Sequence, residues 1–111
     1  MSSNAARERA AELAERMRPL GPIAITRFFG GAGLRLNEVQ FAFVIKGVVY
    51  FRVDTTSRAA FEARGAKPFS YMGRNKTVLV TRYYEVPDDV VEDDDELCHW
   101  AARAIRIAKE G

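Results

Sequence analysis

Residues 39–53 have the sequence VQFAFVIKGVVYFRV, in which two apolar runs flank the pair Lys46-Gly47. Each run alternates with a period of two, which predicts two strands. A two-residue connection containing glycine joins antiparallel strands. In the first run the alternating apolar positions are Val39, Phe41, Phe43 and Ile45. In the second run one face carries Val49, Phe51 and Val53, and the opposite face carries Val48, Tyr50 and Arg52. Both faces of these two strands are rich in apolar residues. They therefore present more apolar surface than a single layer of helices would cover.

The sequence on either side of this hairpin adds three more strands. Upstream, residues 23–36 form one apolar stretch that bends sharply at the glycine-rich run 30–33, and Asn37-Glu38 is suited to a tight turn. Downstream, residues 68–71 and 77–86 form a second hairpin across residues 73–76. The chain is therefore predicted to contain five strands, all antiparallel because their connections are short.

Helices are predicted at both ends of the chain and once between the hairpins. Residues 6–17 carry apolar side chains at spacings of three and four, and Pro19 ends that helix. A short helix is predicted to be capped by Asp54 or Thr55 and to end at Gly65, and a last helix begins near Asp94. The order is α-β-β-β-α-β-β-α. It predicts an α+β fold of two layers, a five-stranded antiparallel sheet with helices against one face. By its length, the chain of residues 1–111 forms a single domain.

Composition and charge limit the classes of protein to which this chain can belong. The net charge of +2 does not by itself indicate nucleic-acid binding. The single cysteine, Cys98, excludes an intrachain disulfide and indicates the cytoplasm, a reducing compartment. We expect no membrane-spanning helix, because no apolar run approaches the required length of about 18 residues. The N-terminal segment lacks the apolar core of a secretory signal.

Charge is divided unevenly along the chain. Residues 1–84 contain 14 Lys/Arg and 6 Asp/Glu, whereas residues 85–111 contain 3 Lys/Arg and 9 Asp/Glu. Such asymmetry marks a partner site in some proteins. The other interpretation is that the acidic C-terminal segment folds back over the basic sheet.

The sequence resembles the TfoX/Sxy N-terminal domain family over about residues 17 to 109. The matching stretches are Leu20-Gly21-Pro22, RFFGGAGL at 27–34, Phe41-Ala42, FEARG at 61–65, Pro68-Phe69-x-Tyr71, YYEVP at 83–87, and Leu97 with Trp100. The family pattern often has Met at position 29 and Trp at position 84, where this chain has Phe and Tyr.

The resemblance implies a secretion-chaperone-like α+β domain and a connection to bacterial competence regulators. The full-length regulators carry a second, C-terminal domain, and we expect this chain to be a stand-alone N-terminal domain. The family supplies no catalytic residues to transfer, so we expect regulation through protein partners and no enzymatic activity.

Motifs that carry chemistry elsewhere have simpler structural interpretations here. Gly30-Gly31-Ala32-Gly33 is followed by a strand and lacks the lysine and helix of a phosphate loop, so it is predicted to be a glycine bend. Cys98 and His99 are neighbours on a helix, about 100° apart, and cannot act together. The acidic run 92–96 is suited to capping a helix. We therefore predict no catalytic residue, no metal site and no cofactor.

A candidate interaction surface combines arginines and tyrosines of the predicted sheet. Its members are Arg27, Arg35, Tyr50, Arg52, Arg82 and Tyr84. Tyr and Arg are enriched at protein interfaces, and an exposed sheet edge favours pairing with a partner or with a second copy. The sequence predicts a regulatory interaction module. The alternatives are a nucleic-acid-binding accessory protein and a small-ligand-binding domain with a pocket near Arg27, Tyr71 and Glu85.

Overall fold

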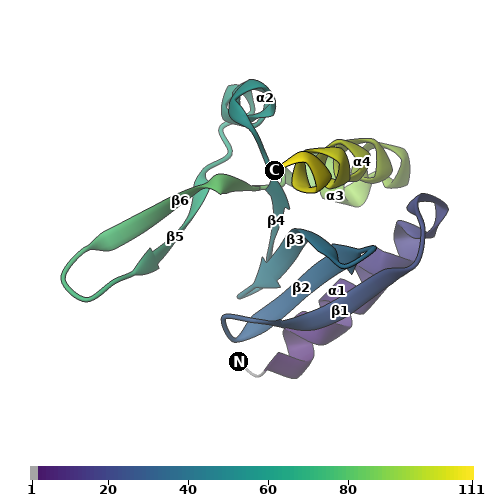
Figure 1. Cartoon of the computed structure of the whole chain (residues 1–111), viewed down its shortest axis with the longest axis horizontal. Helices are drawn as coiled ribbons and strands as arrows, with labels where there is room; N and C mark the ends of the chain where they lie inside the picture. The colour runs from purple at the N-terminus through teal and green to yellow at the C-terminus, as the bar shows by residue number, and fades with distance from the viewer. Residues whose placement is uncertain (1–2) are drawn as a thin grey trace.

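The computed structural model describes residues 3–111, which form helices packed on one antiparallel sheet (Figure 1). The helical elements are α1 (Ser3–Arg16), the 3-10 turn η1 (Arg18–Leu20), α2 (Thr55–Ala63), α3 (Asp88–Glu92) and α4 (Asp94–Glu110). The strands are β1 (Ile23–Phe28), β2 (Gly31–Leu36), β3 (Val39–Ile45), β4 (Val48–Arg52), β5 (Pro68–Met72) and β6 (Thr77–Glu85). The predicted α+β class is confirmed.

The sheet has six strands in the order β1-β2-β3-β4-β6-β5, so the predicted count of five is wrong. Residues 23–36 were expected to form one bent strand, but Phe29 and Gly30 form a turn that divides them into β1 and β2. The glycine-rich run therefore reverses the chain completely, because both turn residues adopt left-handed conformations.

Three successive hairpin turns share this conformation. The φ angles are 49° and 77° at Phe29-Gly30, 52° and 68° at Asn37-Glu38, and 52° and 80° at Lys46-Gly47. Positive φ at both central residues matches the right-handed twist of the flanking strands. The predicted turns at Asn37-Glu38 and Lys46-Gly47 are confirmed.

A bulge in β3 changes the predicted faces of that strand. Ala42 lies opposite Leu34 while Gln40 lies opposite Arg35, so Phe41 is an extra residue in the pairing. Phe41 consequently packs in the main core with Ala42, and Phe43 belongs to a separate cluster. The expectation that Phe41 and Phe43 share a face is therefore wrong, because a bulge breaks the period of two.

One face of the sheet carries the helices and the main core. Helix α1 contacts β1, β2 and β3, and α4 contacts β3 and β4. The largest fully buried side chains of this core are Leu13, Met17, Leu34, Phe41, Val44, Phe51, Phe61, Val90 and Leu97. These side chains come from the apolar stripes predicted for the helices and from one face of each central strand.

The helix ends follow the predicted capping pattern. The Asp54 carboxylate accepts a hydrogen bond of 2.7 Å from the Ser57 backbone N–H at the start of α2, and the Ser57 hydroxyl accepts one from the Asp54 N–H. Gly65 follows that helix with φ 78°. Asp93 caps α4 by accepting from the Glu96 N–H at 3.0 Å.

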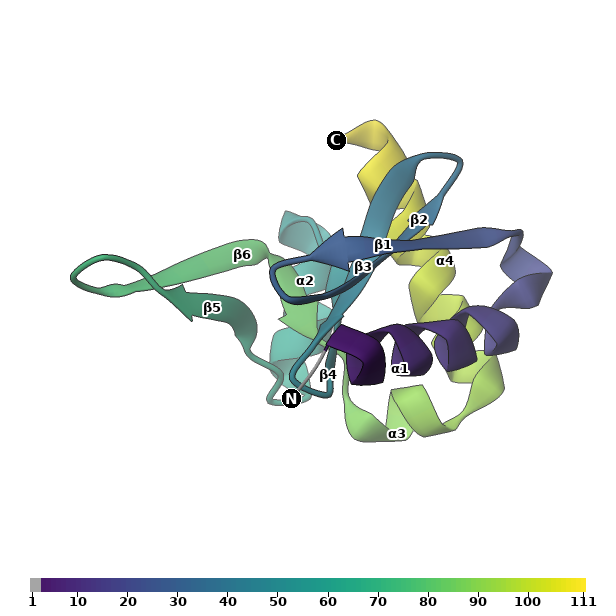
Figure 2. The same ribbon diagram turned by 90° about the horizontal axis from the view of Figure 1, so that it is seen from below.

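Strands β5 and β6 form a hairpin that projects from the rest of the molecule, on the left of Figure 1 and again in the rotated view of Figure 2. The first part of β6 pairs with β5, and its last three residues pair with β4. A register shift between Pro68 and Phe69 separates the two parts. We call residues 67–82 the arm.

Within residues 3–111, no helix has the length and apolar character needed to cross a membrane.

Candidate interaction surface

An aromatic cluster occupies the face of the sheet opposite the helices. Phe43 lies at its centre, because its neighbours Ala42 and Val44 point into the main core and successive strand residues alternate. The Phe43 ring centroid lies 4.6 Å from that of Phe28, 4.7 Å from Tyr83, and 5.1 Å from both Tyr50 and Phe69. Phe43 is only 1% exposed. The rings of the arm and of β1 therefore cover this face in place of helices.

The turn between β1 and β2 meets the arm through Phe29. Its ring stacks on Tyr71 at a centroid distance of 5.9 Å and lies 6.4 Å from Phe69. Strands β1 and β5 are the two ends of the sheet order. The sheet is thus curved strongly enough for elements from its two ends to touch.

A groove separates β5 from the first and third hairpin turns, at Phe29-Gly30 and Lys46-Gly47. Its volume is about 390 Å³. A second hollow of about 450 Å³ lies between these turns and the start of α1, and the two share Phe29, Ile45 and Lys46. The groove is lined by Phe29, Ile45, Lys46, Val48, Tyr50, Phe69, Ser70, Tyr71 and Met72. Its lining is mainly apolar, which is typical of a surface that receives apolar side chains.

Large apolar side chains lie exposed around the groove and on the arm. Exposed fractions are 76% for Met72, 68% for Phe29, 62% for Leu79 and 43% for Tyr71. These are the large exposed hydrophobic residues of the part of the chain described, and all belong to the arm or to the adjoining turn. Such gathering of exposed apolar surface marks interaction sites.

The arm carries only positive charge. It contains Lys67, Arg74, Lys76 and Arg82 and has no Asp or Glu. Lys46 adds a further cation in the groove. Burial and the nearby Glu85 carboxylate raise the pKa of Tyr50, so this phenol stays neutral and adds no negative charge. The surface therefore combines apolar and basic character.

The structure distributes the six residues of the predicted surface over different parts of the fold. Tyr50 lies in the groove, and Arg82 lies exposed on the arm. Tyr84 is buried on the helix side, where its hydroxyl donates to a Glu62 carboxylate oxygen at 2.6 Å. It is therefore not available to a partner in this conformation.

The remaining three predicted residues lie away from the groove lining. Arg27 is exposed on β1, and Arg35 donates to the Glu38 backbone carbonyl within the second turn. Arg52 is half-buried with its guanidinium near Gly111, at the end of α4. The structure thus does not bring the six together as one surface, because arginine and tyrosine content does not reveal which face a strand residue occupies.

Sequence reasoning missed Phe29, Met72 and Leu79. The sequence contains no clear signal for Phe29, since phenylalanine is unusual at a left-handed turn position that Asn and Gly favour. Two members of the pocket considered near Arg27, Tyr71 and Glu85 line different hollows. Tyr71 lines the groove, whereas Glu85 lines hollows beside Arg64 and Arg9.

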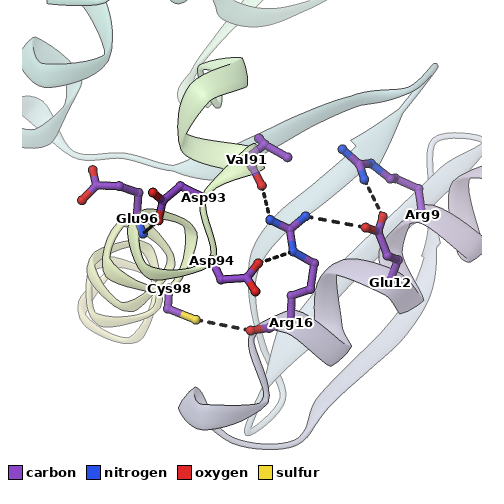
Figure 3. A network of polar contacts seen from close by, with 8 residues as sticks. All are labelled: Arg9, Glu12, Arg16, Val91, Asp93, Asp94, Glu96 and Cys98. Carbon is purple, nitrogen blue, oxygen red and sulfur yellow. Dashed lines mark hydrogen bonds and ion pairs between the residues drawn. The ribbon is translucent and has the colours of Figure 1, made fainter.

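The acidic run and Cys98 form a structural network with α1 (Figure 3). The Arg16 guanidinium donates to an Asp94 carboxylate oxygen at 2.6 Å and to the Val91 carbonyl. The Cys98 thiol donates to the Arg16 carbonyl at 3.5 Å. Burial, with Asp94 and Asp95 nearby, raises the pKa of this thiol, which keeps it protonated and weakly nucleophilic.

The glycine-rich run has no helix after it. Gly30 occupies the first hairpin turn, while Gly31 and Gly33 lie within β2. A Cβ on Gly31 would lie 2.1 Å from the Val44 backbone oxygen. The glycines therefore serve the turn and the close approach of β2 to β3, and the residues following them cannot offer the helix N-terminus of a phosphate loop.

The fold and the groove together define a two-layer α+β domain in which helices cover one face of the sheet and the other face carries the aromatic cluster and the groove. The family model for the TfoX N-terminal domain matches residues 15–108. The chain therefore belongs to the TfoX N-terminal domain family, as the sequence motifs indicated. None of the curated proteins compared with the chain matches it.

Replacing Phe29 with Asn should leave the free energy of unfolding within about 1 kcal/mol of the wild type. Asn tolerates the left-handed turn conformation, and the relieved strain offsets the lost contacts of an exposed ring. Urea denaturation measures the difference. Phe28→Asn is the matched control and should destabilise clearly, because that half-buried ring packs on Phe43. A large loss of stability in Phe29→Asn would show that the Phe29 ring serves folding instead of binding.

Proposed function

We propose that this domain is a non-enzymatic regulatory module that binds a protein partner through the aromatic groove and the arm. The observation that carries the proposal is the gathering of Phe29, Tyr71 and Met72 around a mainly apolar groove. Hiding such side chains from water is favourable, and burial of about 100 Å² of apolar surface contributes about 2.5 kcal/mol. A partner would cover the exposed side chains of Phe29, Tyr71 and Met72.

Family membership supports a regulatory role for the module. The TfoX N-terminal domain resemblance connects it to bacterial competence and transcription, which it would serve through the bound partner. The single half-buried cysteine is compatible with the reducing cytoplasm.

Site-specific photocrosslinking in cells tests the proposal. A photoreactive phenylalanine analogue at position 72, on the groove, should form an adduct with a discrete partner protein. The same analogue at position 110, exposed at the end of α4, is the control and should not form that adduct. Phe29→Asn introduced into the position-72 protein should reduce the adduct several-fold. Identical adducts from both positions, or none from position 72, would contradict the proposal.

The basic arm favours nucleic-acid binding as a second candidate. Exposed rings and cations together suit single-stranded nucleic acid, and such binding weakens steeply as salt rises. Fluorescence anisotropy with labelled oligothymidylate at low salt tests it. Binding that Arg74→Ala/Lys76→Ala removes would support this candidate, and no change in anisotropy would eliminate it.

A further inference from the structure

We infer that the partner contributes an extended, acidic segment that adds as a strand to the free edge of β5 and places apolar side chains in the groove. This inference rests on the proposed function and specifies the class of partner and how it binds. Four features of the molecule lead to it: the edge of β5, the course of the groove, the charge of the arm and the chemistry of the lining.

Strand β5 ends the sheet order, so one of its edges has no neighbouring strand among the residues described. The Gly73 N–H donates to the Lys76 carbonyl at 2.8 Å, which makes these residues a hydrogen-bonded pair. Hydrogen-bonded pairs alternate along an antiparallel ladder. The backbone N–H and C=O groups of Phe69 and Tyr71 therefore point toward β6. The backbone N–H and C=O groups of Ser70 and Met72 point toward the open edge. That edge offers the donors and acceptors that an added strand requires.

The groove follows this edge. Its lining includes four consecutive residues of β5, from Phe69 to Met72. Consecutive side chains point to opposite faces of a strand, so a groove on one face alone would contact only alternate residues. Phe29 and Lys46 line the same groove from the two hairpin turns. A strand lying along β5 would thus direct its alternate side chains into an apolar space that is already formed.

The charges around the groove select an acidic segment. Lys46, Arg74 and Lys76 are exposed near the groove or on the arm, and the arm has no carboxylate to balance them. A second copy docking face to face would bring these cations against their own equivalents, which is unfavourable at an interface. Asp and Glu in a different segment would complement them.

The lining favours a protein segment over a nucleic acid. Ile45, Val48 and Met72 are aliphatic or flexible side chains that pack against other apolar side chains. Phe29 and Tyr71 are already stacked on one another, so a base would have to separate them to insert. The spacing of the free backbone groups of Ser70 and Met72 matches that of a peptide strand.

Selection from a phage-displayed library of random dodecapeptides on the immobilised wild-type domain tests the inference. We expect enriched peptides with several Asp or Glu and alternating apolar residues. Synthetic versions should bind the wild type and Ser70→Ala equally, because alanine keeps the backbone N–H. Ser70→Pro removes that N–H without touching the β5–β6 ladder and should weaken binding at least about tenfold.

A second variant tests the inference independently, in case Ser70→Pro does not fold. Arg74→Glu/Lys76→Glu changes only exposed residues of the arm tip, and it should weaken the same peptides about tenfold or more at low salt. Near-ultraviolet circular dichroism confirms that each variant keeps the aromatic cluster intact.

Three outcomes would overturn the inference. The first is an enriched set without acidic residues. The second is unchanged binding to both Ser70→Pro and the charge-reversed variant. The third is no enriched peptide together with tight binding of labelled oligothymidylate, which would assign the surface to nucleic acid. If position 72 still crosslinks a partner protein in cells while Ser70→Pro binds normally, the proposed function stands and only strand addition fails.

Discussion

Replacing Phe43 with alanine should lower the free energy of unfolding by about 3–5 kcal/mol. The side chain is fully buried, and its ring contacts Phe28, Tyr50, Phe69 and Tyr83. Its removal leaves a cavity between the central strands and the arm. Such a loss is a large part of the 5–15 kcal/mol that typically stabilises a domain. Urea denaturation followed by circular dichroism measures it.

Two control variants distinguish the loss of packing around Phe43 from a general loss of stability on any substitution in this face of the sheet. Phe43→Leu keeps most of the buried volume and should cost considerably less than Phe43→Ala. Leu79→Ala removes a side chain that is mostly exposed and should change stability by less than about 0.5 kcal/mol. Equal effects of Phe43→Ala and Leu79→Ala would contradict the central position of Phe43.

Replacing Gly31 with alanine should destabilise the domain by more than about 3 kcal/mol. The added Cβ would lie 2.1 Å from the Val44 backbone oxygen and 2.9 Å from a side-chain carbon of Ile45. A backbone carbonyl in the middle of a sheet cannot rotate away, so β2 and β3 would have to separate. Because Ile45 also lines the groove, the damage should extend to binding. Thermal and urea unfolding measure the loss.

Gly33→Ala provides the matched comparison within the same strand. Its Cβ would lie 2.4 Å from the Gln40 side-chain oxygen and 2.9 Å from the Thr26 hydroxyl, both at the ends of side chains that can move. We expect a smaller loss, which Gln40→Ala in the same protein should partly restore. If Gly31→Ala were as stable as Gly33→Ala, the close approach of β2 to β3 would not be what makes glycine necessary at position 31.

Local patterns predicted most of the secondary structure. The alternation around Lys46-Gly47, the apolar stripes of the terminal helices and the capping carboxylates of Asp54 and Asp93 act over a few residues. Each is visible in a short window of sequence, so no distant contact is needed to recognise it.

Two errors arose where pairing between strands decided the outcome. The turn at Phe29-Gly30 was not recognised, because phenylalanine is unusual in a left-handed turn position. The bulge at Phe41 was not foreseen either, because a residue becomes extra only relative to its partner strand. Neither feature has a clear local pattern.

The candidate surface shows the same difference between what local sequence patterns predict and what contacts between distant residues decide. Of the residues predicted to share one surface, Tyr50 lies in the groove and Arg82 on the arm, whereas the side chain of Tyr84 lies among the helices. Residue type shows what a side chain can do, whereas its neighbours in space show whether a partner can reach it.

The sequence by itself determined the α+β class, the positions of the helices, three of the hairpin turns and membership of the TfoX N-terminal domain family, because short-range periodicity and ordered motifs carry this information. Only the tertiary structure decided where the aromatic groove lies. Phe29 and Tyr71 are separated by 42 positions in the sequence, and they stack because the curvature of six strands brings the two ends of the sheet together. Curvature accumulates over every strand pair, so no single segment of the sequence contains it.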